Sequence, residues 1–245
     1  MYIALSGAPA READWRGGQA GGPAAAGDPD ALYRQREDLT LARRAEAIWA
    51  SRLAAEPGDF ESAWKLARAR YWIGGRVPKA EGKPVFEAGI EAGRAAARIR
   101  PERPEGHFWI AANMGALAES FGLRQGLRYR GEIKSALLRV LELDPAFQQG
   151  SADRALGRWY FKVPRLFGGS DRKSEEHLRR SLTYGPDSTI SRFFLAETLL
   201  ALDRRDDARN ELERVLEAPL DPDWVPEDRE FKAKARALLD RLDRK

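Results

Sequence analysis

Residues 178–219, LRRSLTYGPDSTISRFFLAETLLALDRRDDARNELERVLEAP, contain the repeating unit that decides the fold. Gly185-Pro186 and Ala218-Pro219 each follow an amphipathic segment of this stretch. Proline ends a helix because it lacks an N–H and clashes with the preceding turn. Together with the segment just before it, the stretch predicts three helices, at 172–184, 188–202 and 204–217.

The same punctuation recurs towards the N-terminus, where Pro57, Pro101 and Pro145 also follow amphipathic segments. With Pro186 and Pro219, the successive spacings are 44, 44, 41 and 33 residues. Ten residues after each of the first four prolines lies an alanine: Ala67, Ala111, Ala155 and Ala196. Four residues before each of the five lies an apolar residue: Leu53, Ala97, Leu141, Leu182 and Val215. A small residue facing an apolar one at fixed positions predicts stacked helical hairpins, each burying its apolar stripe against its neighbours.

This pattern resembles the tetratricopeptide repeat, a helix–turn–helix unit of about 34 residues with small residues at its helix contacts. The earlier units are longer, so they resemble divergent repeats with insertions. We therefore predict an all-α protein whose divergent tetratricopeptide-like hairpins stack into a right-handed solenoid or bundle, with residues 38–245 as one domain. The other predicted helices are 38–55, 60–73, 84–99, 105–120, 127–143, 151–162 and 227–243.

Residues 1–37 are expected to form a flexible leader, because glycine, alanine and proline dominate residues 17–29. Residues 1–5 are apolar, but they are too few for the apolar core of a signal peptide. The sequence leaves two compartments open. The protein stays in the cytoplasm, or a signal was removed before residue 1.

Composition excludes several kinds of chemistry. The chain has no cysteine, which excludes disulfides, thiol catalysis, cysteine-ligated zinc and iron–sulfur clusters. His107 and His177 lie 70 positions apart and form no local metal-ligand pair. The glycines at 17–22 follow no strand, so no nucleotide loop is predicted. We expect no cofactor, no metal and no enzymatic activity.

The charges and the apolar runs also bear on partners. The net charge is +4, and the most basic stretch is interpreted as a solvated helix face rather than a nucleic-acid site. Its residues are Arg124, Arg128, Arg130, Lys134 and Arg139. No apolar run approaches the roughly 20 residues that a membrane span needs, so no transmembrane helix is predicted.

Three loops lengthen the repeats, at 73–84, 120–126 and 163–170. All three follow a helix that begins just after a repeat proline, so we expect them on one edge of the solenoid, where insertions often build a binding face. In the third loop, Gly168 and Gly169 can adopt positive φ. Ser170 is the predicted N-cap of the next helix.

This third segment resembles the T component of TRAP transporters and the related helical component of bacterial sterol transport systems. The shared pattern consists of Pro164, Phe167, Gly168, Gly169, Lys173 and His177, preceded by the small-then-aromatic residues 155–161. The resemblance implies a periplasmic helical bundle with an apolar pocket or pore, tethered by a lipid and working beside a solute-binding protein. A lipid tether needs a cysteine, which this sequence lacks.

Aromatic pairs recur on the helices that follow the repeat prolines. Consecutive helical positions point about 100° apart, so both members of a pair are difficult to bury in one narrow stripe. One ring of each pair could pack in the core while the other contacts an apolar guest. The predicted ligand-contact residues are Trp72, Phe108, Trp109, Trp159, Tyr160 and Phe167.

Two functions from different classes follow. The first is a non-enzymatic transport component that binds a lipid or sterol in an aromatic cavity and docks on a periplasmic binding protein or transporter subunit. The second is a tetratricopeptide-type interaction scaffold without a small-molecule ligand, in the periplasm or the cytoplasm. A lipid carrier should have an apolar cavity lined by Trp72, Trp109 and Trp159, whereas a scaffold should bury these rings.

Overall fold

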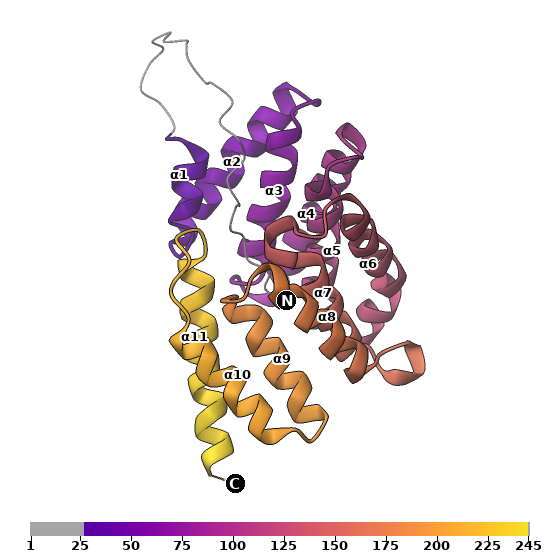
Figure 1. Cartoon of the computed structure of the whole chain (residues 1–245). Coiled ribbons are helices and arrows are strands. Elements are labelled where there is room, and N and C mark those ends of the chain that lie inside the picture. Colours follow the sequence, from indigo (N-terminus) through magenta and orange to yellow (C-terminus); the bar gives the residue numbers. More distant parts are fainter. Residues whose placement is uncertain (1–26, 245) are drawn as a thin grey trace.

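The computed structural model describes residues 27–244 and, for residues 123–125, the backbone alone. Within this part of the chain every regular element is helical, and the helices stack into an open bundle (Figure 1). In chain order they are α1 (Pro29–Arg34), α2 (Leu39–Ala55), α3 (Phe60–Gly74), α4 (Lys79–Ile99), α5 (Pro104–Phe121), α6 (Leu123–Leu143), α7 (Phe147–Lys162), the 3₁₀ helix η1 (Arg165–Phe167), α8 (Asp171–Tyr184), α9 (Thr189–Ala201), α10 (Arg205–Glu217) and α11 (Val225–Asp243).

The ten predicted helices all form, as α2 to α11, and the repeat prolines lie between them. Capping side chains explain why two helices begin where they do. Asp59 accepts a hydrogen bond from the backbone N–H of Ser62 at 3.0 Å, and Ser188 accepts one from Ser191 at 3.3 Å. Each cap satisfies an N–H that has no partner within its helix.

Each helix from α2 to α11 packs on the next one along the chain, which makes the fold a stack of hairpins. The helices that follow the repeat prolines, α3, α5, α7 and α9, also contact one another in turn and form an inner row. The four aligned alanines lie in this row and are fully buried: Ala67, Ala111, Ala155 and Ala196. Their small side chains allow the close helix contacts that the sequence predicted.

Two of the three predicted loops are shorter than expected. Helix α4 begins at Lys79, ahead of Pro84, so the first loop spans only residues 75–78. The second loop shrinks to Gly122, which separates α5 from α6 with φ of +87°. Because glycine has no Cβ, it adopts this conformation without strain and lets α6 begin at once.

The predicted leader boundary at residue 37 differs from the structure, because residues 29–37 pack into the domain. Leu32 and Tyr33 of α1 are buried in the main core, and the Tyr33 ring meets that of Trp49 at 5.8 Å. Helix α1 has only six residues, capped by Asp28, and is therefore too short for a periodic pattern. The rest of the predicted leader, residues 1–26, lies outside the described residues.

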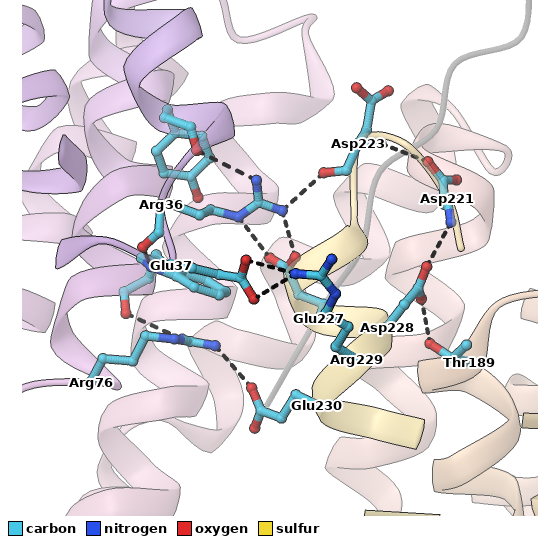
Figure 2. A network of polar contacts seen from close by, with 12 residues as sticks. Arg36, Glu37, Arg76, Thr189, Asp221, Asp223, Glu227, Asp228, Arg229 and Glu230 are labelled. Carbon is cyan, nitrogen blue, oxygen red and sulfur yellow. Dashed lines mark hydrogen bonds and ion pairs between the residues drawn. The ribbon is translucent and has the colours of Figure 1, made fainter. Parts of the chain in front are cut away.

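A polar network joins the two ends of the described chain (Figure 2). At its centre, Arg36 Nη2 and Nε donate to the Glu227 carboxylate at 2.5 and 3.1 Å, and both side chains are almost fully buried. Arg36 Nη2 also donates to the carbonyl oxygen of Asp223 at 2.9 Å. We call this contact between the α1–α2 turn and the start of α11 the end-to-end clasp.

Aromatic rings and outer ion pairs surround the buried centre of the clasp. The Arg36 guanidinium lies 5.1 to 5.3 Å from three ring centroids, those of Tyr33, Trp72 and Trp224. Trp72 Nε1 donates to the Arg36 carbonyl oxygen at 2.7 Å. Nearer the surface, Arg229 of α11 pairs with Glu37 of the α1–α2 turn, and Glu230 of α11 pairs with Arg76 of the α3–α4 loop. The clasp therefore closes a stack that would otherwise have two free ends.

Candidate functional site: a pocket between α5, α6 and α7

A pocket of about 300 Å³ opens between α5, α6 and the end of α7. Its apolar walls are formed by Ala118, Leu127, Ile133, Trp159, Val163 and Pro164. Ile133 and Trp159 are buried, so they form the inner part of the wall. The glycines Gly115, Gly122 and Gly126 leave room for the opening because they carry no side chains.

Cationic side chains stand among these apolar walls. Arg158 is neutralised from both sides, since it donates to Glu119 on α5 at 3.2 Å and to Glu197 on α9 at 2.6 Å. Arg130 and Lys162 line the same pocket, and neither is held in a direct salt bridge to another described residue. The pocket thus combines an apolar interior with the cationic side chains of Arg130 and Lys162, and the Glu119 carboxylate, which also lines it, interacts electrostatically with Lys162.

Trp159 is held firmly against the pocket. Its Nε1 donates to the Arg130 carbonyl oxygen at 3.1 Å, which ties α7 to α6. Its ring meets that of Tyr160 edge-on at 4.9 Å, and the Lys134 ammonium lies 5.3 Å from its centroid. This indole is therefore preorganised as a rigid apolar wall with its polar atom already satisfied.

Behind Trp159, a second layer fixes Tyr160. The Tyr160 ring stacks on His177 of α8 at 5.3 Å with the two planes 14° apart. His177 Nδ1 lies 2.6 Å from the carboxylate of the fully buried Asp153. The Lys173 ammonium also approaches the Tyr160 ring, 5.6 Å from its centroid. Two residues of the predicted motif, Lys173 and His177, thus support the pocket wall rather than enter the pocket.

The junction loop, residues 163–170, connects α7 to α8 through η1 and forms the outer edge of the pocket. Gly168 has φ of +101° and ends η1, as the sequence predicted, whereas Gly169 does not have positive φ. Ser170 caps α8 by accepting from the Lys173 N–H at 3.3 Å, which confirms the predicted cap. Its own N–H donates to the Tyr160 carbonyl oxygen at 2.9 Å.

Gly169 is predicted to be the least replaceable residue of the junction loop. A Cβ at this position would lie 1.7 Å from the Val163 carbonyl oxygen, so the backbone itself would have to move. We expect Gly169→Ala to lower the free energy of unfolding by about 1–3 kcal/mol, measured by urea denaturation. Gly58→Ala is the matched control, because a Cβ there meets nothing within 4 Å. An equal effect of both substitutions would contradict this explanation.

The structure separates the six predicted ligand-contact residues. Trp72, Phe108 and Trp109 are at most 2% exposed and do not line the pocket. Phe108 and Trp109 pack against each other at 5.1 Å within the main core. Trp159 lines the pocket, while Tyr160 lies behind it and Phe167 lies beside it under the Arg130 guanidinium, at 5.2 Å.

Sequence reasoning misses the other pocket residues. It places Arg130 on a solvated helix face and gives Ile133 and Arg158 no role. The relevant signal for Arg158 is its place between Glu119 and Glu197, each 39 residues away on a neighbouring helix of the inner row. Such a pairing becomes recognisable only when the register of the inner row is known.

Residues 94–244 match the model described as TAtT, the TRAP transporter T-component. This chain belongs to the TRAP transporter T-component family. The matched residues include the whole pocket and the junction loop, so this T component carries both features within the region that defines its family.

Solved structures establish the fold of this T component. It is similar to TTC0263, a thermophilic TPR protein in Thermus thermophilus, with a TM-score of 0.64 and 22% identity over 86% of this chain and 97% of that one. It is also similar to MamA, with a TM-score of 0.51 and 17% identity over 82% of this chain and 95% of that one. The search among curated proteins found no match. The predicted tetratricopeptide-like architecture and the family resemblance are thus both confirmed.

Two further findings on this T component concern membrane spans and metal sites. Within residues 27–244, no helix is both long enough and apolar enough to cross a membrane. The same residues contain no group of three potential metal ligands from histidine, cysteine, aspartate and glutamate.

Proposed function

We propose that this T component is a non-enzymatic part of a bacterial transport system in the periplasm. In this role it binds an apolar small molecule of the lipid or sterol class in the α5–α7 pocket and docks on a periplasmic binding protein or transporter subunit. The observation that carries the proposal is the apolar pocket beside Trp159, within the residues that match the family.

The pocket has the properties that an apolar guest requires. Ligand pockets typically span about 300–1,000 Å³, so this one suits a short or partly inserted guest. Binding would be driven by burial of apolar surface, at about 25 cal/mol per Å². Ile133 and Trp159 would contact the apolar body, and Arg130 and Lys162 would hold the polar end near the opening. Trp72, Phe108 and Trp109 have a packing role in this proposal.

The burial of Trp72, Phe108 and Trp109 favours the second candidate function, an interaction scaffold without a small-molecule ligand. In that case the inner row of helices would serve only to hold a docking surface for a partner protein. The two functions differ in whether anything occupies the α5–α7 pocket, and this can be measured directly.

The test of the proposal is mass spectrometry of lipid extracts from the purified protein, followed by titration of the extracted compound while tryptophan fluorescence is recorded. A carrier should yield a stoichiometric apolar compound that quenches Trp159 on rebinding. A Trp159→Phe variant identifies the responding indole. Absence of any copurifying or rebinding compound would support the scaffold instead.

Filling the pocket should weaken ligand binding without unfolding the protein. Ala118 is a half-buried wall residue, and we expect Ala118→Phe to weaken ligand binding by at least about tenfold, or 1.4 kcal/mol. Ala80→Phe on the exposed start of α4 is the matched control and should leave affinity unchanged. Calorimetric titration provides the affinity and circular dichroism the helix content. Unchanged affinity in Ala118→Phe would place the ligand elsewhere.

A further inference from the structure

The junction loop exposes the most accessible large apolar side chain of the described residues. Leu166 is 88% exposed, whereas the next such residues, Leu138, Tyr184 and Leu220, are 41 to 44% exposed. The loop projects from the bundle between α7 and α8 (Figure 1). Leu166 lies in η1, in the middle of this projecting loop, and buries almost none of its surface.

The loop is held in a defined conformation by its own backbone. Inside it, the N–H groups of Phe167 and Gly169 both donate to the Pro164 carbonyl oxygen, at 2.8 and 3.2 Å. At its end, Ser170 is bonded to the carbonyl oxygen of Tyr160. A preorganised loop loses little conformational entropy on binding, so the display of Leu166 favours contact with another surface.

Several exposed cationic residues lie within seven positions of Leu166 in the sequence. The Arg165 side chain is 80% exposed, and Lys162, Arg172 and Lys173 are exposed as well. The Asp171 carboxylate at the start of α8 is 17% exposed and is already paired with Arg165 at 2.7 Å. The loop and the helix ends that flank it thus display one exposed leucine together with exposed cations, a combination that complements a surface with apolar and anionic parts.

We propose that the junction loop contacts an anionic lipid surface, with Leu166 inserted among the acyl chains and the exposed cations on the headgroups. Leucine beside lysine and arginine is the composition of interfacial lipid contacts, and anionic lipids attract each such cation. A protein partner fits this composition less well, because lysine is depleted in protein interfaces and leucine is under-represented among their hot spots.

The position of the loop relates this contact to the pocket. Lys162, Val163 and Pro164 line the pocket and lead directly into the loop. Contact of Leu166 with a lipid surface would bring the pocket opening close to that surface, so an amphiphile could pass between them with a short exposure to water. This consequence rests on the proposed function, whereas the lipid contact itself does not.

The test is cosedimentation of the full chain with vesicles. Wild-type protein should bind vesicles containing about one third phosphatidylglycerol and should not bind pure phosphatidylcholine. Binding should decrease strongly between about 0.05 M and about 0.5 M NaCl, because salt screens the headgroup attraction. Failure of the wild-type protein to bind acidic vesicles at low salt would overturn the proposal.

Variants of the loop test the residues directly. Leu166→Asp should weaken vesicle binding by about tenfold or more, since it removes the inserted side chain and adds a negative charge. The matched control is Leu220→Asp, which alters an exposed leucine in the α10–α11 loop. Arg172→Gln with Lys173→Gln should weaken binding by about thirtyfold. The control for charge is Lys79→Gln with Arg98→Gln, two exposed residues of α4.

Equal losses in loop variants and controls would overturn the proposal, because the attraction would then come from net charge alone. It would also be overturned if Leu166→Asp left vesicle binding intact but broke a complex with a binding protein, or changed the oligomeric state in light scattering. Ala118→Phe separates this proposal from the proposed function, because it should weaken ligand binding and leave vesicle binding unchanged.

Discussion

Replacing Glu227 with glutamine is expected to lower the free energy of unfolding by about 3–5 kcal/mol, because it leaves the buried guanidinium of Arg36 without its counter-charge. Burial raises the pKa of the Glu227 carboxyl above its usual value, although Arg36 acts in the opposite direction. The ionised Glu227 carboxylate is therefore stabilised by Arg36, and the buried Arg36 guanidinium is stabilised by Glu227. Urea denaturation followed by circular dichroism measures the effect.

Two further variants separate burial from charge in the clasp. Arg229→Gln removes an outer pair whose side chains are 60% and 52% exposed, and it should cost at most about 1 kcal/mol. The double substitution Arg36→Met with Glu227→Met should recover most of the lost stability, because apolar residues of similar size avoid the desolvation cost. Similar losses in Glu227→Gln and Arg229→Gln would show that the centre of the clasp is not the stabilising part.

Replacing Trp109 with alanine is expected to lower the free energy of unfolding by about 3–5 kcal/mol, because a fully buried indole leaves a cavity in a close-packed core. The ring would lose its contacts with Tyr71 at 5.6 Å and Phe108 at 5.1 Å. Denaturation measures this loss. At temperatures where the variant remains folded, its affinity for the pocket ligand should match that of the wild-type protein.

Trp109→Phe is the milder control and should cost less, because it removes less volume from the same site. The contrasting outcome would be a tenfold loss of ligand affinity with unchanged unfolding free energy. That result would make Trp109 a ligand contact, as its place in an aromatic pair suggests.

Local signals in the sequence are sufficient for the helices and their order. Proline at each repeat boundary and alanine at each fixed inner position reflect constraints that act within a few residues, so they can be read without knowing the fold. Helix α1 could not be predicted from such signals, because its six residues are too few to show a helical hydrophobic period. The first residues of α4 and α6 are predicted as loops because Pro84 and Gly126 are typical of loops, although both lie inside helices here.

The candidate site was only partly predictable, for a different physical reason. Trp159 and Trp109 each belong to a pair of adjacent aromatic residues, yet Trp159 lines a pocket and Trp109 fills the core. The difference depends on how far neighbouring helices separate. Here Gly122 and the junction loop open a space beside α7, a property of the assembled layers rather than of either pair. The clasp was unpredictable for the same reason, since Arg36 and Glu227 lie 191 positions apart.

The clasp also changes how such a molecule should respond to force and to synthesis. Solenoids whose repeats contact only their neighbours lengthen gradually under force and unfold from either end. Here, pulling on the terminal helices should meet a single abrupt rupture, because the stack cannot lengthen until the Arg36–Glu227 pair breaks. On the ribosome, Arg36 is synthesised 191 residues before Glu227, so the clasp forms only after the repeats between them have emerged.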